Sequence, residues 1–246
     1  MNLMNHLIKL KDISVSYQNI YALRGVNLEV DPGEYIGIFG PNGSGKTTLL
    51  KTILGLKEPD KGRVELFGSD NLKKMRKNIG YVPQNPLAER NFPASVQKVV
   101  EMGLYGKIGF LKPLKEEDHQ KAEEALHKVH MGDYKNRPIG HLSGGELQKV
   151  MVARALASNP NVILLDEPTS SLDFVMTRDL MELMEELNEK YNITIMVIHH
   201  HIDLLLPYCS RLLLLNREII YDGSPDSEEV HEKIRQIFNL PEEIEV

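Results

Sequence analysis

The sequence predicts an α/β protein with a mostly parallel sheet and an α-helical insertion in the middle of the chain. Three observations support this fold class. Short apolar stretches alternate with helical patterns, which is typical of parallel strands joined by helices. A glycine-rich loop at 40–45 stands between an apolar strand pattern and a helical pattern. The region 85–142 holds helical patterns and no convincing strand, which predicts an insertion between two parts of the core.

The expected elements follow in order along the chain. Apolar and polar residues alternate over 12–17 and 26–30, which predicts two strands, and 35–39 is an apolar run typical of a buried strand. After the glycine loop and its helix we expect a strand within 57–68, a strand at 79–82, the helical region, a helix from Gly145 to about Ser158, a strand at 161–165, a helix at 174–191, a strand at 193–198, a helix, a strand at 212–215 and a helix near 228–238.

The composition is that of a globular chain long enough for one or two hydrophobic cores. Of 246 residues, 41% are hydrophobic and 26% charged, which excludes collagen, a disordered tail and a coiled-coil rod. The single cysteine, Cys209, excludes an internal disulfide and a secreted disulfide framework. The net charge of −6 argues against a dedicated nucleic-acid-binding protein, which usually carries a basic surplus.

No stretch of the sequence is apolar over the roughly 20 residues that a membrane-spanning helix needs. The longest apolar runs, such as 195–198 and 212–215, are short, and 1–10 lacks the apolar segment of a signal peptide. We therefore expect any role at a membrane to depend on a partner chain.

The loop after the strand at 35–39 matches the phosphate-binding pattern Gly-x4-Gly-Lys-Thr, called Walker A. Its residues are Gly40, Pro41, Asn42, Gly43, Ser44, Gly45, Lys46, Thr47 and Thr48. Glycines let successive backbone N–H groups converge on phosphate oxygens, and the helix that follows points its positive end at the same anion. In this pattern Lys46 reaches the β- and γ-phosphates and the Thr47 hydroxyl binds Mg²⁺. A merely structural glycine turn is the alternative, but the strand before and the helix after favour phosphate binding.

Two acids end the apolar strand at 162–165. Such a strand places its final carboxylates at the carboxyl edge of a parallel sheet, where ligands bind. We expect Asp166 to hold Mg²⁺ through its water shell and Glu167 to polarise the water that attacks the γ-phosphate. Many strands end in an acid that only caps the next turn, and that is the alternative.

A second candidate anion site opens the helix that begins near Gly145. Ser143, Gly144 and Gly145 lie in the sequence Leu142–Gln148, and a serine before two glycines at a helix start can bind an anion. One phosphate loop already serves one nucleotide, so this second site suggests a nucleotide held by another copy. A serine N-cap with a glycine-rich turn is the alternative.

These motifs together resemble the ATP-binding subunit of ABC transporters over essentially the whole chain. The resemblance implies a P-loop NTPase core with an N-terminal antiparallel β subdomain. It implies a single domain, 1–246, with an ATP-binding core at 1–84 and 159–246 and a helical subdomain at 85–158. That subdomain ends in the helix that carries the family's signature motif, Leu142–Gln148, called the signature below. It also implies that Gln84 contacts the γ-phosphate and Mg²⁺, that Tyr17 stacks on adenine and that 171–173 is the D-loop.

The sequence departs from this family at two places. Lys149 stands where an arginine is usual. Any of three histidines, His199, His200 and His201, could hold the position of the family's switch histidine, which forms a hydrogen bond to the γ-phosphate. In this family an Asp, a Tyr and an Arg usually follow that histidine after three, eight and eleven residues. Counting from His200, the sequence has Asp203, Tyr208 and Arg211 at these positions, and Thr194, six residues before, also agrees. A metal site is the alternative for the triplet, but adjacent strand residues point to opposite faces and chelate one ion poorly.

The resemblance also implies cofactors and partners. We expect ATP and Mg²⁺ to bind in a head-to-tail homodimer, or a pair with a related ATPase, in which loop 40–48 of one subunit faces 143–145 of the other. We expect membrane permease subunits to contact 84–90 and the helical insertion, at the cytoplasmic face of the membrane. An extracytoplasmic binding protein would select the substrate.

The stretches 91–96 and 99–106 resemble the branch of the family that imports zinc or manganese. Importers of iron chelates and of cobalt or nickel are close alternatives. A soluble ABC ATPase that serves as a scaffold in iron–sulfur cluster assembly is an alternative from another class, and its partner would be soluble.

Overall fold

The computed structural model describes residues 6–84, 93–109 and 112–238. The chain divides into two compact units, one made of 1–76 with 194–246 and one made of 77–193. The expected permease contact at 85–90 and the first two residues of the stretch 91–96 lie outside the described residues. The expected boundary between the core and a helical subdomain stays a prediction.

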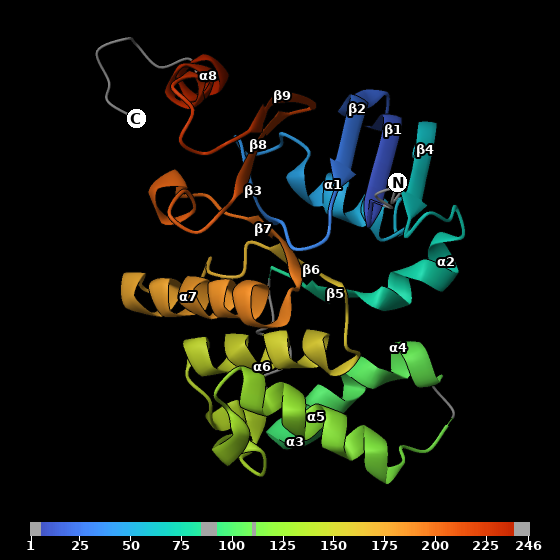
Figure 1. Ribbon diagram of the computed structural model, residues 1–246, viewed down its shortest axis with the longest axis vertical. Helices are drawn as coiled ribbons and strands as arrows, with labels where there is room; N and C mark the ends of the chain where they lie inside the picture. The colour runs from blue at the N-terminus through green and yellow to red at the C-terminus, as the bar shows by residue number, and fades with distance from the viewer. Residues whose placement is uncertain (1–5, 85–92, 110–111, 239–246) are drawn as a thin grey trace. The chain divides into compact units, whose positions relative to one another are not determined.

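Two sets of strands form the first unit (Figure 1). An antiparallel sheet has the order β2 (Ile20–Val30), β1 (Ile8–Tyr17) and β4 (Lys61–Leu66). Parallel strands follow the order β7 (Thr194–Ile198), β3 (Tyr35–Phe39) and β8 (Arg211–Asn216), and β9 (Glu218–Gly223) pairs antiparallel with β8. β3, with both neighbours parallel, is buried at every position, which is why its sequence is continuously apolar.

Short helices complete the first unit. They are α1 (Lys46–Ile53), α2 (Leu72–Met75), the 3₁₀ turn η6 (Ile202–Leu204) and α8 (Glu229–Phe238). α8 buries Val230, Ile234 and Ile237, one face of a helix at 3.6-residue spacing. Its last ring, Phe238, lies 5.4 Å from the ring of Phe39 between centroids, so α8 packs next to the end of β3. Along the chain, η1 (Arg76–Asn78) joins the two units.

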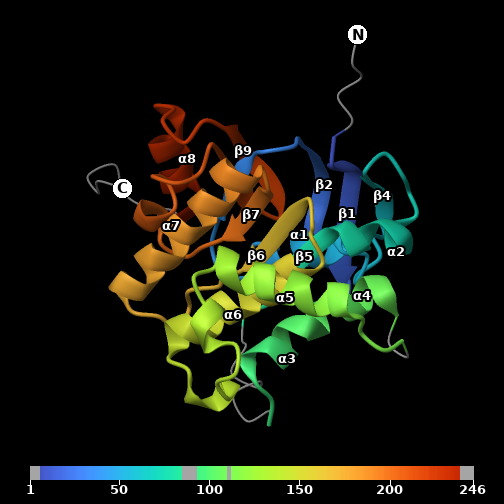
Figure 2. The same cartoon turned by 60° about the horizontal axis from the view of Figure 1, so that its bottom comes forward.

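The second unit combines a pair of parallel strands with helices. The strands are β5 (Ile79–Val82) and β6 (Val162–Asp166). The helices are α3 (Val96–Glu101), η3 (Met102–Leu104), α4 (Tyr105–Ile108), α5 (Glu116–Lys128), η4 (Gly132–Tyr134), η5 (Ile139–His141), α6 (Gly144–Ala157) and α7 (Phe174–Tyr191). Helices α3, α5 and α6 pack against one another (Figure 2), and α6 also packs on β5 and α7.

The strand order and the antiparallel N-terminal sheet confirm the expected fold class. One expected element is wrong and one strand was missed. The helix expected between 198 and 212 is only the turn η6, because Pro207 lacks an N–H and disfavours helical backbone at the residue before it. Strand β9 was not expected, because it is a short edge strand in which no residue is fully buried. Within 6–84, 93–109 and 112–238, no helix is both long and apolar enough to span a membrane.

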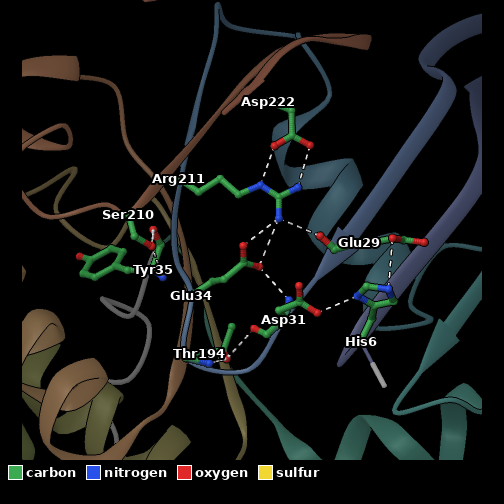
Figure 3. A network of polar contacts seen from close by, with 10 residues as sticks. His6, Glu29, Asp31, Glu34, Tyr35, Thr194, Ser210, Arg211 and Asp222 are labelled. Atoms are coloured by element: carbon green, nitrogen blue, oxygen red, sulfur yellow. Dashed lines mark hydrogen bonds and ion pairs between the residues drawn. The ribbon is translucent and has the colours of Figure 1, made fainter. Parts of the chain in front are cut away.

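Arg211 lies at the centre of a polar network in the first unit (Figure 3). Its guanidinium donates two parallel hydrogen bonds to Asp222 of β9, of 2.6 and 2.8 Å, and others to the Glu34 carboxylate and the Glu29 carbonyl, each 2.9 Å. The Asp222 and Glu34 carboxylates raise the pKa of Arg211 above its ordinary value. The network therefore joins β8 and β9 to the end of β2 and to the turn before β3.

The same network continues through the turn at 31–34. The Asp31 N–H donates to Glu34, and the Asp31 carboxylate lies 2.7 Å from His6 Nδ1. The Thr194 hydroxyl donates to the Asp31 carbonyl and accepts from the Gly33 N–H. The first residue of β7 is thus fastened to the turn that begins β3.

Candidate functional site

The glycine loop turns between β3 and α1 as the sequence predicts. Gly45 is the N-cap residue of α1 and has a φ of 100°, which favours glycine. A Cβ atom at Gly45 would lie 2.3 Å from the Ala22 carbonyl oxygen, and one at Gly40 would lie 2.0 Å from the Leu215 carbonyl oxygen. The loop therefore runs in close contact with β2 on one side and with β8 on the other.

Backbone hydrogen bonds hold the loop in the same place. The Arg217 N–H, in the turn between β8 and β9, donates to the Ser44 carbonyl at 2.7 Å, and the Arg217 carbonyl accepts from the Arg24 N–H of β2 at 2.8 Å. Arg217 has a φ of 64°, a conformation that costs energy in a residue other than glycine. Surrounding strands thus preorganise the loop.

The polar groups of the loop suit a bound anion. Lys46 is 5% exposed, and its ammonium donates to the carbonyls of Gly40 and Pro41 at 2.9 and 3.0 Å. The Ser44 hydroxyl is buried without a hydrogen-bond partner among the described residues, which is costly unless a ligand satisfies it. Thr47 and Thr48 lie in the first turn of α1, the end of a helix where the aligned peptide dipoles favour an anion.

Tyr17 ends β1 and remains 48% exposed. The Lys57 ammonium lies 5.0 Å from the centroid of its ring. The adjoining Ser16 donates both its N–H and its hydroxyl to Asp60, each at 2.6 Å, so the segment that carries Lys57 is fastened beside Tyr17. The exposed ring can stack on a planar base.

Asp166 is the last residue of β6 and is 2% exposed. The hydroxyl of Tyr81, in the neighbouring β5, donates to Asp166 Oδ2 at 3.3 Å. Burial, with a further contribution from the Asp166 charge, raises the pKa of Tyr81 to about 12. The phenol therefore keeps its proton at neutral pH and acts as the donor.

Glu167 follows in a backbone conformation that is unusual for its residue type. Its φ is 51° and it is 8% exposed. The Gln84 side-chain amide donates to Glu167 Oε2 at 2.5 Å. The second unit therefore brings Gln84, Asp166 and Glu167 together at the carboxyl ends of β5 and β6, as the sequence predicts for Asp166 and Glu167.

Ser143 is the N-cap residue of α6 in a capping box. Its hydroxyl accepts from the Glu146 N–H at 3.3 Å, and its own N–H donates to the Glu146 carboxylate at 2.7 Å. The Ser143 N–H holds the pKa of Glu146 below its ordinary value. Gly144 and Gly145 form the first turn, and a Cβ at Gly145 would lie 3.3 Å from Met176 Sδ of α7.

The three histidines differ in their surroundings. His199 is 2% exposed and its Nδ1 accepts from the His201 N–H at 2.9 Å, whereas His200 is exposed. Thr194 and Arg211, whose spacing favours His200, belong to the network of Figure 3, and the choice of His200 stays a prediction. Within the described ranges, no group of three or more His, Cys, Asp or Glu side chains could hold a metal ion.

The site residues therefore divide between the two units. The first unit contains Tyr17, the loop 40–48 and His200, and the second contains Gln84, 143–145 and the acids 166–167. Tyr81 was not predicted from the sequence, because its contact with Asp166 depends on the pairing of strands that are far apart in the chain.

Comparisons with known proteins decide the family. The family model described as "ABC transporter" matches residues 23–170. The chain is 40% identical over 231 residues to a manganese transport system ATP-binding protein, MntB, of Bacillus subtilis, covering 94% of this chain and 92% of that one. It is 39% identical over 223 residues to a zinc uptake system ATP-binding protein, ZurA, of Listeria innocua, covering 90% and 87%.

This chain belongs to the ABC transporter family. A solved dimeric ATP-binding cassette bound to ADP and Pi is 32% identical, with a TM-score of 0.74 over 89% of this chain and 99% of that one. The resemblance stated from the motifs is thereby confirmed. As an ABC transporter ATPase, the chain binds and hydrolyses ATP.

Proposed function

We propose that this ATPase drives the import of a divalent metal ion, manganese or zinc, through separate membrane subunits. The observation that carries the proposal is 40% identity over 94% of the chain to a protein named for manganese transport, together with 39% identity to one named for zinc uptake. Both names describe transport systems, which favours a membrane partner over a soluble scaffold. The chain then acts at the cytoplasmic face of the membrane.

In this proposal the nucleotide is held by the residues named from the motifs. Tyr17 stacks on adenine, the N–H groups of 40–48 and the Lys46 ammonium bind the phosphates, and the buried Ser44 hydroxyl gains a partner. The oxygens of Thr47, Gln84 and Asp166 are of the kind that Mg²⁺ prefers. When bound, the ion neutralises phosphate charge.

Three residues are assigned to the reaction. Glu167 orients the attacking water and takes up its proton, helped by its position directly after Asp166. His200 donates a hydrogen bond to the γ-phosphate. Lys46 stabilises charge on the transferred group. His199 supports the choice of His200, because its own ring is buried and bonded to the backbone of His201.

The active form is proposed to be a head-to-tail dimer with a second copy or a related ATPase. Ser143, Gly144 and Gly145 would meet the nucleotide bound by the partner, since they open α6 and part of this turn is solvent-exposed. The dimeric state of the cassette bound to ADP and Pi supports this arrangement. Permease subunits and an extracytoplasmic binding protein complete the transporter.

The proposal is tested in two steps. Tagged protein isolated from detergent-solubilised membranes of its host is expected to carry a polytopic membrane protein, identified by mass, and recovery of soluble assembly proteins alone contradicts transport. Uptake of manganese and zinc is then compared in cells that carry the wild type or Glu167→Gln. We expect Glu167→Gln to abolish uptake and to accumulate an ATP-bound dimer, because the base is lost while binding remains. Normal steady-state turnover by this variant would rule out Glu167 as the base.

A further inference from the structure

We propose that Tyr81 is a positioning residue for Asp166, and that its hydroxyl holds Oδ2 so that the carboxylate keeps one orientation toward Mg²⁺. This inference rests on the proposed magnesium site. It adds a residue that lies outside the phosphate loop, the signature and the two acids.

The register of the strands explains how Tyr81 reaches Asp166. In the parallel pair of β5 and β6, Tyr81 lies beside Leu164. Leu164 and Asp166 are two residues apart in a strand, so their side chains leave the same face, about 6.6 Å apart along it. A tyrosine side chain is long enough to span that step, and the hydroxyl arrives 3.3 Å from Asp166 Oδ2. A shorter side chain at 81 does not reach.

The donor is carried by a rigid part of the second unit. Helix α6 packs on β5, and at Gly80 a Cβ atom would lie 3.1 Å from the Cβ and the carbonyl oxygen of Ala155. The close approach of α6 leaves β5 little room to move. A donor on such a support fixes its acceptor more tightly than a donor on a loop does.

The acceptor needs such a donor. Asp166 is 2% exposed, and a buried carboxylate is stable only when its oxygens are hydrogen-bonded. Groups that hydrogen-bond to metal ligands orient them, and their loss typically weakens metal affinity by about 10- to 100-fold. The Tyr81 bond is long, so we expect a loss of about tenfold, at the lower end.

The test separates magnesium binding from nucleotide binding. The affinity of the full chain for a non-hydrolysable, fluorescent, ribose-labelled ATP is measured with excess Mg²⁺ and with EDTA, and the ratio of the two gives the contribution of the metal. Tyr81→Phe is expected to leave the affinity in EDTA unchanged and to reduce the magnesium-dependent gain about tenfold. Tyr191→Phe, at the exposed end of α7, is the matched control and is expected to bind as the wild type.

A double-mutant cycle with Asp166→Asn tests whether the two residues act together. Adding Tyr81→Phe to Asp166→Asn is expected to change nothing further. An undiminished magnesium-dependent gain in Tyr81→Phe overturns the positioning role. So does an equal loss with Mg²⁺ and with EDTA, because that pattern indicates structural damage. If the wild type binds the analogue equally well with and without Mg²⁺, the proposed magnesium site itself fails, which is a different outcome.

Discussion

The close approach at Gly45 predicts a difference between two glycines of the same loop. Gly43 and Gly45 both have positive φ, 76° and 100°, so alanine at either position pays for an unfavourable backbone conformation, about 1–2 kcal/mol. Only at Gly45 does the new Cβ also meet the backbone, 2.3 Å from the Ala22 carbonyl oxygen, whereas nothing lies within 4 Å at Gly43. Gly43→Ala is therefore a matched control for Gly45→Ala.

The size of the difference follows from this overlap. Real Cβ contacts essentially never fall below 3.0 Å, so in Gly45→Ala either the loop or β2 must move. Overlap of this kind in a packed region costs about 1–3 kcal/mol. Gly45→Ala should therefore have a free energy of unfolding lower than that of Gly43→Ala by this amount, which is roughly 5- to 160-fold in the folding equilibrium.

Urea unfolding of the wild type and both variants measures these free energies. Titration with ATP measures the affinity of each variant for the nucleotide, which depends on the conformation of the loop. Gly45→Ala is also expected to bind ATP more weakly than Gly43→Ala, because the N–H groups that face the phosphates shift with the loop. Equal free energies of unfolding for the two variants would refute the argument that contact with β2 requires a glycine at 45.

Two further predictions concern charged side chains. Lys46→Ala is expected to weaken ATP affinity about tenfold or more, because a hydrogen bond to a charged group contributes about 1.5–3 kcal/mol. An unchanged dissociation constant in a calorimetric titration would contradict the role of Lys46. Arg211→Ala is expected to lower the free energy of unfolding by about 2–3 kcal/mol, because it removes the paired bonds to Asp222 and the bond to Glu34. Arg178→Ala, which removes an exposed ion pair, is the control and is expected to lower the free energy of unfolding by less than about 1 kcal/mol. If urea unfolding gives the same decrease for both variants, the network of Arg211 adds no stability.

Much of the candidate site could be predicted because its motifs are local in the sequence. The loop 40–48 needs glycines at fixed positions between a strand and a helix, and these requirements are written in consecutive residues. The same holds for Ser143–Gly145 at the start of α6 and for the acids at the end of β6. The fold class followed from apolar periodicity, since a parallel strand buried on both faces has a distinct pattern.

Elements that depend on weak or distant signals were missed. β9 is an edge strand that pairs on one side with β8, so its sequence carries little of the apolar pattern that marks a central strand. The helix expected after 198 is only the turn η6. The apolar spacing there favoured a helix, but Pro207 disfavours helical backbone at the residue before it. The choice of His200 over its neighbours rests on the spacing to residues such as Thr194 and Arg211, and it stays a prediction.

The sequence by itself determined the fold class, the phosphate loop, the two acids and Ser143 at the start of α6, because each depends on residues within a few positions of one another. The tertiary structure decided which side chains hold those groups in place. The contact of Tyr81 with Asp166 requires β5 to pair with β6 in one register, and the network of Arg211 requires β8 to lie beside β3 and β9. Pairing between segments that are far apart in the chain is set by packing of the whole core, and local patterns do not contain it.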